Sequence, residues 1–314
     1  MVKLMKNRPK CIGSGLITLD ILIKDLNFRD LSYYVGGSCG NVLMILSHFG
    51  WDVYPISRLK SDKHAYRLVT DLKNNGVNLD YISLSETGST PIIIQRNIID
   101  RLGNPKHKFE FIDPYSGKYL PSFKSITIKM AKAILEETIY PNVFYFDRLT
   151  PGIIDLVRAY KEKGSLIVFE PSSIKFKDFD KVKHLIDIIK FSDQRIKNYK
   201  ELINPSIIPL EIETMGVNGL RYRCNFLDRE WHHLNPFLID DVIDSSGAGD
   251  WSSAAIIYYL QEKFDSSLKN LTQMDIENVL LFAQKLGALN CTFEGARGLM
   301  KLSKDKILKK VNYL

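Results

Sequence analysis

Residues 244–260 read DSSGAGDWSSAAIIYYL, a run of small residues that leads directly into a strongly apolar helix. Between Ser245 and Gly249 no long side chain obstructs the backbone, so several amides can converge at the helix N-terminus and form an anion site. Asp250 follows at the boundary, within reach of a hydroxyl that attacks a bound phosphate. Alternatively, Asp250 only caps the helix and the glycines only turn the chain. Because the helix is apolar nearly all round, we expect it to be central, with its N-terminus at a cleft.

The segment YVGGSCGN, residues 34–41, predicts a second ligand contact. Gly36 and Gly37 let a ligand approach the backbone closely. Asn41 begins or enters the next helix, and its amide can donate to a sugar hydroxyl and accept from one. A simple turn with an N-cap is the alternative interpretation of this segment.

The segment IGSGLITLD, residues 12–20, places Gly13 and Gly15 in a strand and Asp20 at the end of that strand. It lacks the third glycine of the dinucleotide fingerprint, and the sequence contains no G-x-x-x-x-G-K-[ST] phosphate loop. Nicotinamide enzymes and P-loop kinases are therefore disfavoured.

The pattern of elements predicts an α/β fold. A strand at 143–147, a helix at 151–163 and a strand at 165–170 follow βαβ order, which implies a parallel sheet covered on both faces, with ligands at the carboxyl ends of the strands. Residues 22–35 and 90–112 instead alternate apolar and polar residues, so we expect them to form a small β flap. An ordinary surface hairpin is the alternative for each of them.

Composition excludes several classes of protein. The 314 residues are 45% hydrophobic and 25% charged, as in globular chains rather than disordered or collagenous ones. A net charge of +7 suits an anionic ligand, but the basic residues are spread without long runs, so nucleic acid is not an expected partner. The four scattered cysteines favour a reduced, cytoplasmic setting. We expect neither a signal peptide nor a membrane span.

The order of these motifs resembles the ribokinase (PfkB) family of sugar and nucleoside kinases. The resemblance rests on Gly-x-Gly with Asp20, on Gly36-Gly37 with Asn41, on Thr214-Met215-Gly216 with Gly219, and on GAGD, and it spans nearly the whole chain. It implies a single ribokinase-like domain over residues 1–314. This would be a three-layer α/β sandwich with a central, mostly parallel sheet and a β lid formed by segments 22–36 and 90–115.

The resemblance also implies residue roles. ATP would be the donor, with Mg²⁺ at its phosphates, and K⁺ is left open as a further ion. The implied catalytic residues are Asp250 as the base, with Gly247, Ala248 and Gly249 as the anion hole. The implied acceptor-binding residues are Asp20, Gly36, Gly37 and Asn41, and the implied nucleotide-binding residues are Thr214, Gly216, Gly219 and Ser246. We also expect the dipole of the helix to keep Asp250 ionised.

Several positions depart from the family pattern or leave a choice. The family's N-x-x-E motif could correspond to Ser192 and Arg195, or to Asn198 and Glu201. Arg148 follows a strand at the ligand-binding edge, where it could bind substrate or phosphate, or form a salt bridge with a neighbouring acid. The pair His232 and His233 lacks other ligands at metal spacing, so we reject a metal site there.

The acceptor class is the most open prediction. A sugar or polyol is the first hypothesis, because the glycines and polar side chains supply directional contacts. A nucleoside acceptor is the alternative, and it would need an aromatic platform from Tyr33, Tyr34 or Phe109. A non-catalytic sugar- or nucleotide-binding protein could share the fold. The exposed strand edges of the lid also suggest a homodimer formed through the lid.

Overall fold

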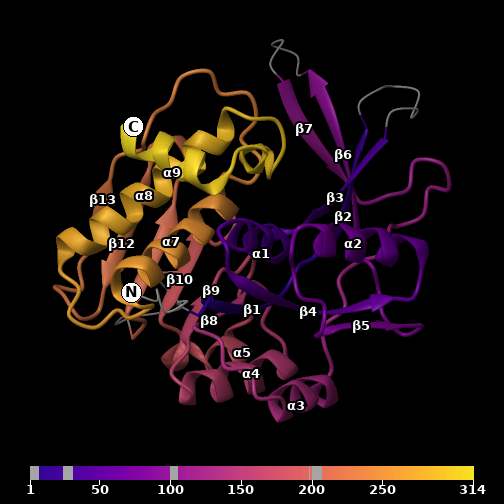
Figure 1. Ribbon diagram of the computed structural model, residues 1–314, viewed down its shortest axis with the longest axis horizontal. Helices are drawn as coiled ribbons and strands as arrows, with labels where there is room; N and C mark the ends of the chain where they lie inside the picture. The colour runs from indigo at the N-terminus through magenta and orange to yellow at the C-terminus, as the bar shows by residue number, and fades with distance from the viewer. Residues whose placement is uncertain (1–6, 24–30, 100–104, 198, 200–206) are drawn as a thin grey trace, which may run out of the picture.

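The computed structural model describes residues 7–23, 31–99, 105–197, 199 and 207–314 (Figure 1). A nine-stranded sheet runs through its centre in the order β13-β12-β11-β10-β9-β8-β1-β4-β5. Its strands are β1 (Lys10–Ser14), β4 (Asp52–Lys60), β5 (Ile82–Ser85), β8 (Val143–Phe146), β9 (Leu166–Phe169), β10 (Ile188–Ser192), β11 (Leu210–Thr214), β12 (Leu220–Cys224) and β13 (His232–Leu234).

Pairing in this sheet is mostly parallel. Neighbours from β5 through β11 are parallel, and only β12 and β13 join antiparallel. The parallel strands are short, continuous apolar runs such as VFYF in β8 and LIVF in β9, and both are buried along their whole length. Because parallel strands end at one edge, side chains that follow β8, β9, β10 and β11 are brought together there.

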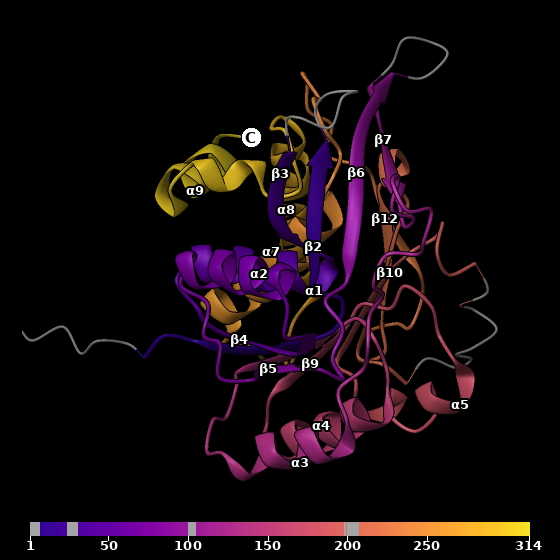
Figure 2. The same cartoon turned by 90° about the vertical axis from the view of Figure 1, so that its right-hand side faces the viewer.

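Helices cover both faces of the sheet, which makes three layers (Figure 2). One face carries α1 (Ser38–His48), α2 (Lys63–Asn74), α7 (Ala248–Phe264), α8 (Gln273–Cys291) and α9 (Lys304–Tyr313), and the other carries α3 (Ile128–Glu136), α4 (Pro151–Glu162) and α5 (Phe176–Phe179). Short 3-10 turns lie at η1 (Lys183–Leu185), η2 (Gly216–Asn218) and η3 (Gly298–Lys301). The helix α7 is buried on most sides, around Trp251 and Leu260, which confirms the central position predicted for it.

A separate four-stranded sheet forms the lid. Its order is β3-β2-β6-β7, with β2 (Thr18–Ile23), β3 (Leu31–Gly36), β6 (Ile92–Ile99) and β7 (Pro105–Glu110). The sheet packs against α2 and stands away from the central sheet (Figure 2). The flap prediction is thus confirmed, although segments 24–30 and 100–104 lie outside the described residues. A single domain over residues 1–314 stays a prediction.

The position of Asp20 differs from the prediction. We expected it at the end of the first strand, but β1 stops at Ser14 and Asp20 lies inside the lid strand β2. The chain turns away at Gly15, where a β-carbon would lie 2.1 Å from a carboxylate oxygen of Asp147. The next residue, Leu16, donates its amide to that same carboxylate at 2.8 Å.

None of the described helices is long and apolar enough to cross a membrane.

Candidate active site

The N-terminus of α7 has the geometry of an anion site. Gly247 is the N-cap in a left-handed conformation, with φ of 76°, and a β-carbon there would lie 2.3 Å from the carbonyl oxygen of Ala296. Glycine is therefore required by conformation and by space. Among the described residues, nothing accepts from the amides of Gly249 and Asp250. Trp251 fixes the helix by donating its indole N–H to the same Ala296 carbonyl at 3.0 Å.

The loop before α7 is held from two sides. The carboxylate of Asp244 accepts from the amide of Ser246 and from the amide of Gly295, each at 2.7 Å. The buried side chain of Asn290 donates to the Ser246 carbonyl at 2.9 Å. The amide of Ala248 makes a long 3.4 Å contact with Ser245. These contacts give the small-residue run one conformation, so its open amides are preorganised.

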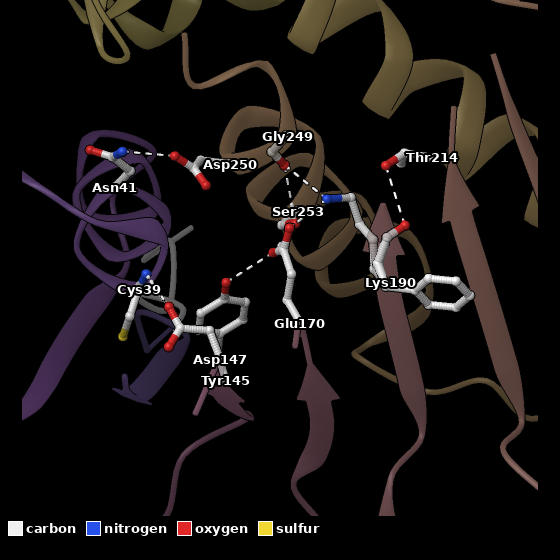
Figure 3. Close-up of polar contacts among 11 residues, drawn as sticks. Cys39, Asn41, Tyr145, Asp147, Glu170, Lys190, Thr214, Gly249, Asp250 and Ser253 are labelled. Atoms are coloured by element: carbon white, nitrogen blue, oxygen red, sulfur yellow. Dashed lines mark hydrogen bonds and ion pairs between the residues drawn. The ribbon is translucent and has the colours of Figure 1, made fainter. Parts of the chain in front are cut away.

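Asn41 joins the two glycine motifs. It lies in the first turn of α1 and donates its side-chain N–H to a carboxylate oxygen of Asp250 at 2.7 Å, across 209 residues of sequence (Figure 3). Its other side-chain atom, the buried Oδ1, has no partner among the described residues. A hydroxyl that enters the site could donate to this oxygen. The structure thus shows that Asn41 orients Asp250, and its contact with the acceptor stays a prediction.

Asp20 explains the double glycine. Thr18 donates its hydroxyl to the Asp20 carboxylate at 2.5 Å. A β-carbon on Gly36 would lie 1.9 Å from that carboxylate, and one on Gly37 would lie 2.3 Å from the carbonyl oxygen of Leu16. Gly36 is therefore needed for the close approach of β3 to Asp20 on β2, and Gly37 for the approach of the start of α1 to Leu16. Burial raises the pKa of Asp20 to about 6, although the hydrogen bond from Thr18 opposes the rise.

Comparisons with known proteins agree with this geometry. No protein-family model matches the sequence. The chain is 22% identical over 317 residues to probable fructokinase-6, chloroplastic, from Arabidopsis thaliana, which covers 91% of this chain and 78% of that protein. The structure of this chain superposes on the ATP-bound fructokinase of Xylella fastidiosa with a TM-score of 0.76 at 18% identity. The superposition covers 97% of this chain and 98% of that one.

Two further solved structures share the fold across nearly the whole chain. Arabidopsis thaliana ribokinase, complexed with ribose and ATP, gives a TM-score of 0.69 at 15% identity and covers 98% of this chain and all of that one. The nucleoside kinase of Burkholderia thailandensis, in complex with inosine, gives 0.70 at 15% identity and covers 96% and 97%. The chain is thus similar in sequence to fructokinases and shares the fold of these kinases.

The protonation of Asp250 differs from the prediction. Burial, and then the charge of Glu170, raise its pKa to about 7. The hydrogen bond from Asn41 and the charges of Lys190 and Arg195 oppose that rise without cancelling it. The expectation that the helix dipole keeps Asp250 ionised therefore does not hold at neutral pH, because desolvation and a neighbouring like charge outweigh the dipole.

A buried charged network lies beneath α7, and sequence reasoning missed most of it. Lys190, in the middle of β10, donates to Glu170 at 2.7 Å and to the carbonyl oxygen of Gly249 at 3.1 Å (Figure 3). The hydroxyls of Tyr145 and Ser253 donate to the other carboxylate oxygen of Glu170. The signal was present, since IIKFS places one lysine inside an otherwise apolar strand.

Asp147 holds the segment between β1 and β2 and the start of α1 at the edge of the central sheet. Its buried carboxylate follows β8 and accepts from the amides of Leu16, at 2.8 Å, and Cys39, at 3.0 Å. Burial raises its pKa to about 6. Arg148 lies 3.3 Å from the same carboxylate. The salt-bridge alternative for Arg148 is therefore confirmed, and a contact of Arg148 with substrate stays a prediction.

The predicted nucleotide residues lie at the same sheet edge. Thr214 ends β11 and donates its hydroxyl to the carbonyl oxygen of Phe191 at 3.3 Å. Gly216 and Gly219 both have positive φ, 58° and 83°, in the tight turn that follows. A β-carbon on Gly219 would lie 2.2 Å from the carbonyl oxygen of Leu234 on β13. The turn is thus built by glycine, and its contact with a nucleotide stays a prediction.

The structure describes only one of the two candidate positions for the N-x-x-E motif of the ribokinase family. Ser192 ends β10, and the amide of Arg195 donates to its carbonyl at 3.0 Å in the turn that follows. Asn198 and Glu201 lie outside the described residues.

His232 lies on β13 and contacts Asp228 at 2.8 Å. Within the described part of the chain, no group of three His, Cys, Asp or Glu side chains is arranged to hold a metal.

Proposed function

We propose that the protein is an ATP-dependent kinase that transfers the γ-phosphoryl group to a hydroxyl of a small sugar or polyol. The observation that carries this proposal is the carboxylate of Asp250, held by Asn41 beside the open amides at the start of α7. A carboxylate and an anion site within one helical turn are what phosphoryl transfer needs. The names of the fructokinase and ribokinase relatives support a sugar as acceptor.

In this mechanism Asp250 takes the proton from the acceptor hydroxyl. The hydroxyl oxygen then bonds to the γ-phosphorus, the bond from that phosphorus to the bridging oxygen breaks, and ADP leaves with the electron pair. The amides of Gly247, Ala248 and Gly249, together with the open amide of Asp250, would stabilise the charge on the transferring group. The proton on Asp250 returns to solvent after release of product. Because the pKa of Asp250 is about 7, it can serve as an acceptor of protons near neutral pH.

The remaining predicted residues have supporting roles in the proposal. Asp20 and the backbone at Gly36 and Gly37 would hold the other hydroxyls of the acceptor, together with Asn41. The nucleotide would lie along the turn after β11 and the loop before α7, against Thr214, Gly216, Gly219 and Ser246.

ATP would bring Mg²⁺ with it. The described residues contain no three-ligand protein cluster, which fits an ion held mainly by phosphate oxygens and water. When bound, the ion would neutralise charge on the phosphates. If the N-x-x-E motif corresponds to Ser192 and Arg195, Arg195 stands where the family keeps an acid; we therefore assign the ion no protein ligand, and we assign no residue to K⁺.

A nucleoside is the second candidate acceptor, and one face of the lid favours it. In the strand register Tyr34 pairs with Asp20, so the two side chains lie on one face of the sheet. Gln95 pairs with Leu22 and with Phe109, which places Phe109 on that same face. Tyr34 is 45% exposed and Phe109 is 52% exposed, so both rings can meet a base.

Tyr33 does not belong to this surface. It alternates to the opposite face of β3, where the guanidinium of Arg67 lies 4.1 Å from its ring centre. Of the three aromatic residues considered for a platform, only Tyr34 and Phe109 thus share a face with Asp20.

The experiment that tests the proposal is a screen for acceptor-dependent release of ADP. The protein with MgATP is offered pentoses, hexoses, keto-acid sugars, inositols and nucleosides, and ³¹P NMR identifies the phosphoester formed. We expect turnover with at least one sugar, polyol or nucleoside, at least tenfold above the rate without acceptor. No turnover with any acceptor, despite measurable binding of ATP, would favour the binding-protein alternative.

Location and assembly also belong to the proposal. We expect a cytoplasmic enzyme and a homodimer formed through the lid. Light scattering after size exclusion distinguishes the two assembly states, since one chain has a mass of 36.0 kDa. A mass near that value at micromolar concentration contradicts the dimer.

A further inference from the structure

The buried pair of Lys190 and Glu170 is tied directly to the anion site. Lys190 is only 3% exposed, although it carries an ammonium group, and burial of an unpaired charge would be costly. Its Nζ donates to Glu170 and to the carbonyl oxygen of Gly249, which is the second residue of α7 (Figure 3). Both carboxylate oxygens of Glu170 accept hydrogen bonds, since Tyr145 and Ser253 also donate to it.

We propose that Lys190, held in place by Glu170, is a positioning residue that orients and polarises the peptide between Gly249 and Asp250. The peptide unit is planar and trans, so the Gly249 carbonyl and the Asp250 amide point in opposite directions. A donor fixed on the carbonyl therefore fixes the direction of the N–H. It also withdraws electron density from the peptide, which makes the Asp250 amide a stronger donor towards a phosphoryl group.

The placement of the pair argues for more than a contribution to folding. A buried ion pair is often no more stabilising than apolar side chains of similar volume. Lys190 interrupts the apolar strand β10 at its middle, Glu170 follows the carboxyl end of β9, and the pair lies beneath the start of α7. By contrast, the ion pair of Lys161 and Asp187 lies where the chain enters β10, at the opposite end of the strand.

The inference rests on the proposed function and is tested in the same assay. In Lys190→Met the length of the side chain is kept and its charge is lost. We expect kcat to fall at least about tenfold, because one misaligned donor of an anion hole costs somewhat less than a deleted one. The KM values for ATP and acceptor should stay within about threefold. The matched control Lys161→Met breaks an ion pair remote from the site and should keep kcat within twofold.

The double variant Lys190→Met/Glu170→Gln separates positioning from folding. It leaves no unpaired charge, so we expect its melting temperature to recover towards that of the wild type. The polarising charge at Gly249 is still absent, so kcat should stay at least about tenfold below that of the wild type. Recovery of kcat together with stability would overturn the inference and leave the kinase assignment intact. Lack of activity in the wild type would instead remove the proposed function.

The pH profile supplies a readout that a structural role would not move. The groups that interact with Asp250 include Asn41 and Cys39 from α1, Tyr145 on β8, Glu170 after β9, Lys190 on β10 and Arg195 after β10. In Glu170→Gln the like charge is lost, so the pKa of Asp250 should fall and the acidic limb of kcat/KM should move at least half a pH unit lower. An unmoved limb contradicts electrostatic coupling between the pair and the site.

Discussion

The floor of the site, which comprises Lys190, Glu170 and Asp250 at the start of α7, differs in construction from the lid above it. In the floor, Lys190 and Glu170 lie among buried side chains and are hydrogen-bonded to each other. The lid face instead presents Asp20 beside the exposed rings of Tyr34 and Phe109. A fully bonded network fixes geometry, whereas exposed rings gain their contacts only when a ligand arrives. We infer that the floor sets the rate of the chemistry and the lid sets the choice of acceptor.

The largest effect should come from the floor. In Asp250→Asn the group that receives the proton is lost, but the size of the side chain is kept. We expect kcat to fall by about 10²–10⁴, the range for removal of a general base, with little change in the affinity for ATP. Steady-state kinetics with the acceptor found in the screen, together with calorimetric titration of ATP, check both points.

A matched control lies at the other end of the same helix. Asp265 caps α7 in a left-handed conformation, which asparagine also tolerates. Asp265→Asn should therefore keep wild-type turnover. If Asp250→Asn retained a near-normal rate, Asp250 would lose its role as the base.

The next effect belongs to the lid and should appear mainly in KM. In Asp20→Asn the charge that would hold acceptor hydroxyls is removed, so we expect the KM for the acceptor to rise about tenfold while kcat falls less than threefold. Asp113→Asn is the control, because that residue lies in an exposed turn after β7, where its carboxylate accepts from the amides of Tyr115 and Ser116. An effect of Asp20→Asn on kcat alone would remove the division of labour between lid and floor.

A smaller effect should distinguish the two acceptor classes. Tyr34→Ala and Phe109→Ala should lower kcat/KM for a nucleoside about three- to tenfold, because a ring contact with the base is lost. The kcat/KM for a simple sugar should stay within about twofold of the wild-type value. Tyr66→Ala provides an exposed aromatic control on α2. If Tyr34→Ala leaves sugar and nucleoside turnover equally unchanged, the aromatic platform is wrong.

The smallest effect concerns stability. The pKa of Asp250 is about 7 in the folded chain and near 3.8 in the unfolded chain. Protonation of this carboxyl therefore favours folding, and its contribution to the free energy of unfolding is fully present below about pH 4 and is lost as pH rises through 7. Asparagine does not titrate. Without ligands, the melting temperature of Asp250→Asn relative to wild type should therefore be about 2–4 °C higher at pH 8 than at pH 5. A constant difference across this range contradicts the raised pKa.

The sequence predicted the parts of the molecule that depend on local pattern. The glycines at 36, 37 and 247 are required by close approach or positive φ, and such requirements are visible in a sequence. The three layers followed from continuous apolar strands alternating with helices.

The contacts that cross the fold were not predictable in the same way. The bond from Asn41 to Asp250 joins positions 209 residues apart, and no local pattern encodes it. Asp20 was assigned to the wrong strand, because the turn at Gly15 depends on the distant carboxylate of Asp147. The pKa of Asp250 was misjudged for the same reason, since Glu170 approaches it only in the folded chain.

The most direct test of the central claim is the pH dependence of kcat/KM for the wild-type protein, with an acceptor that does not titrate. This ratio reports the ionisation of the free enzyme. If Asp250 is the base, kcat/KM should rise about tenfold per pH unit in acid and level off with an apparent pKa near 7. A profile that stays flat between pH 5 and 8 would contradict Asp250 as the group that accepts the proton.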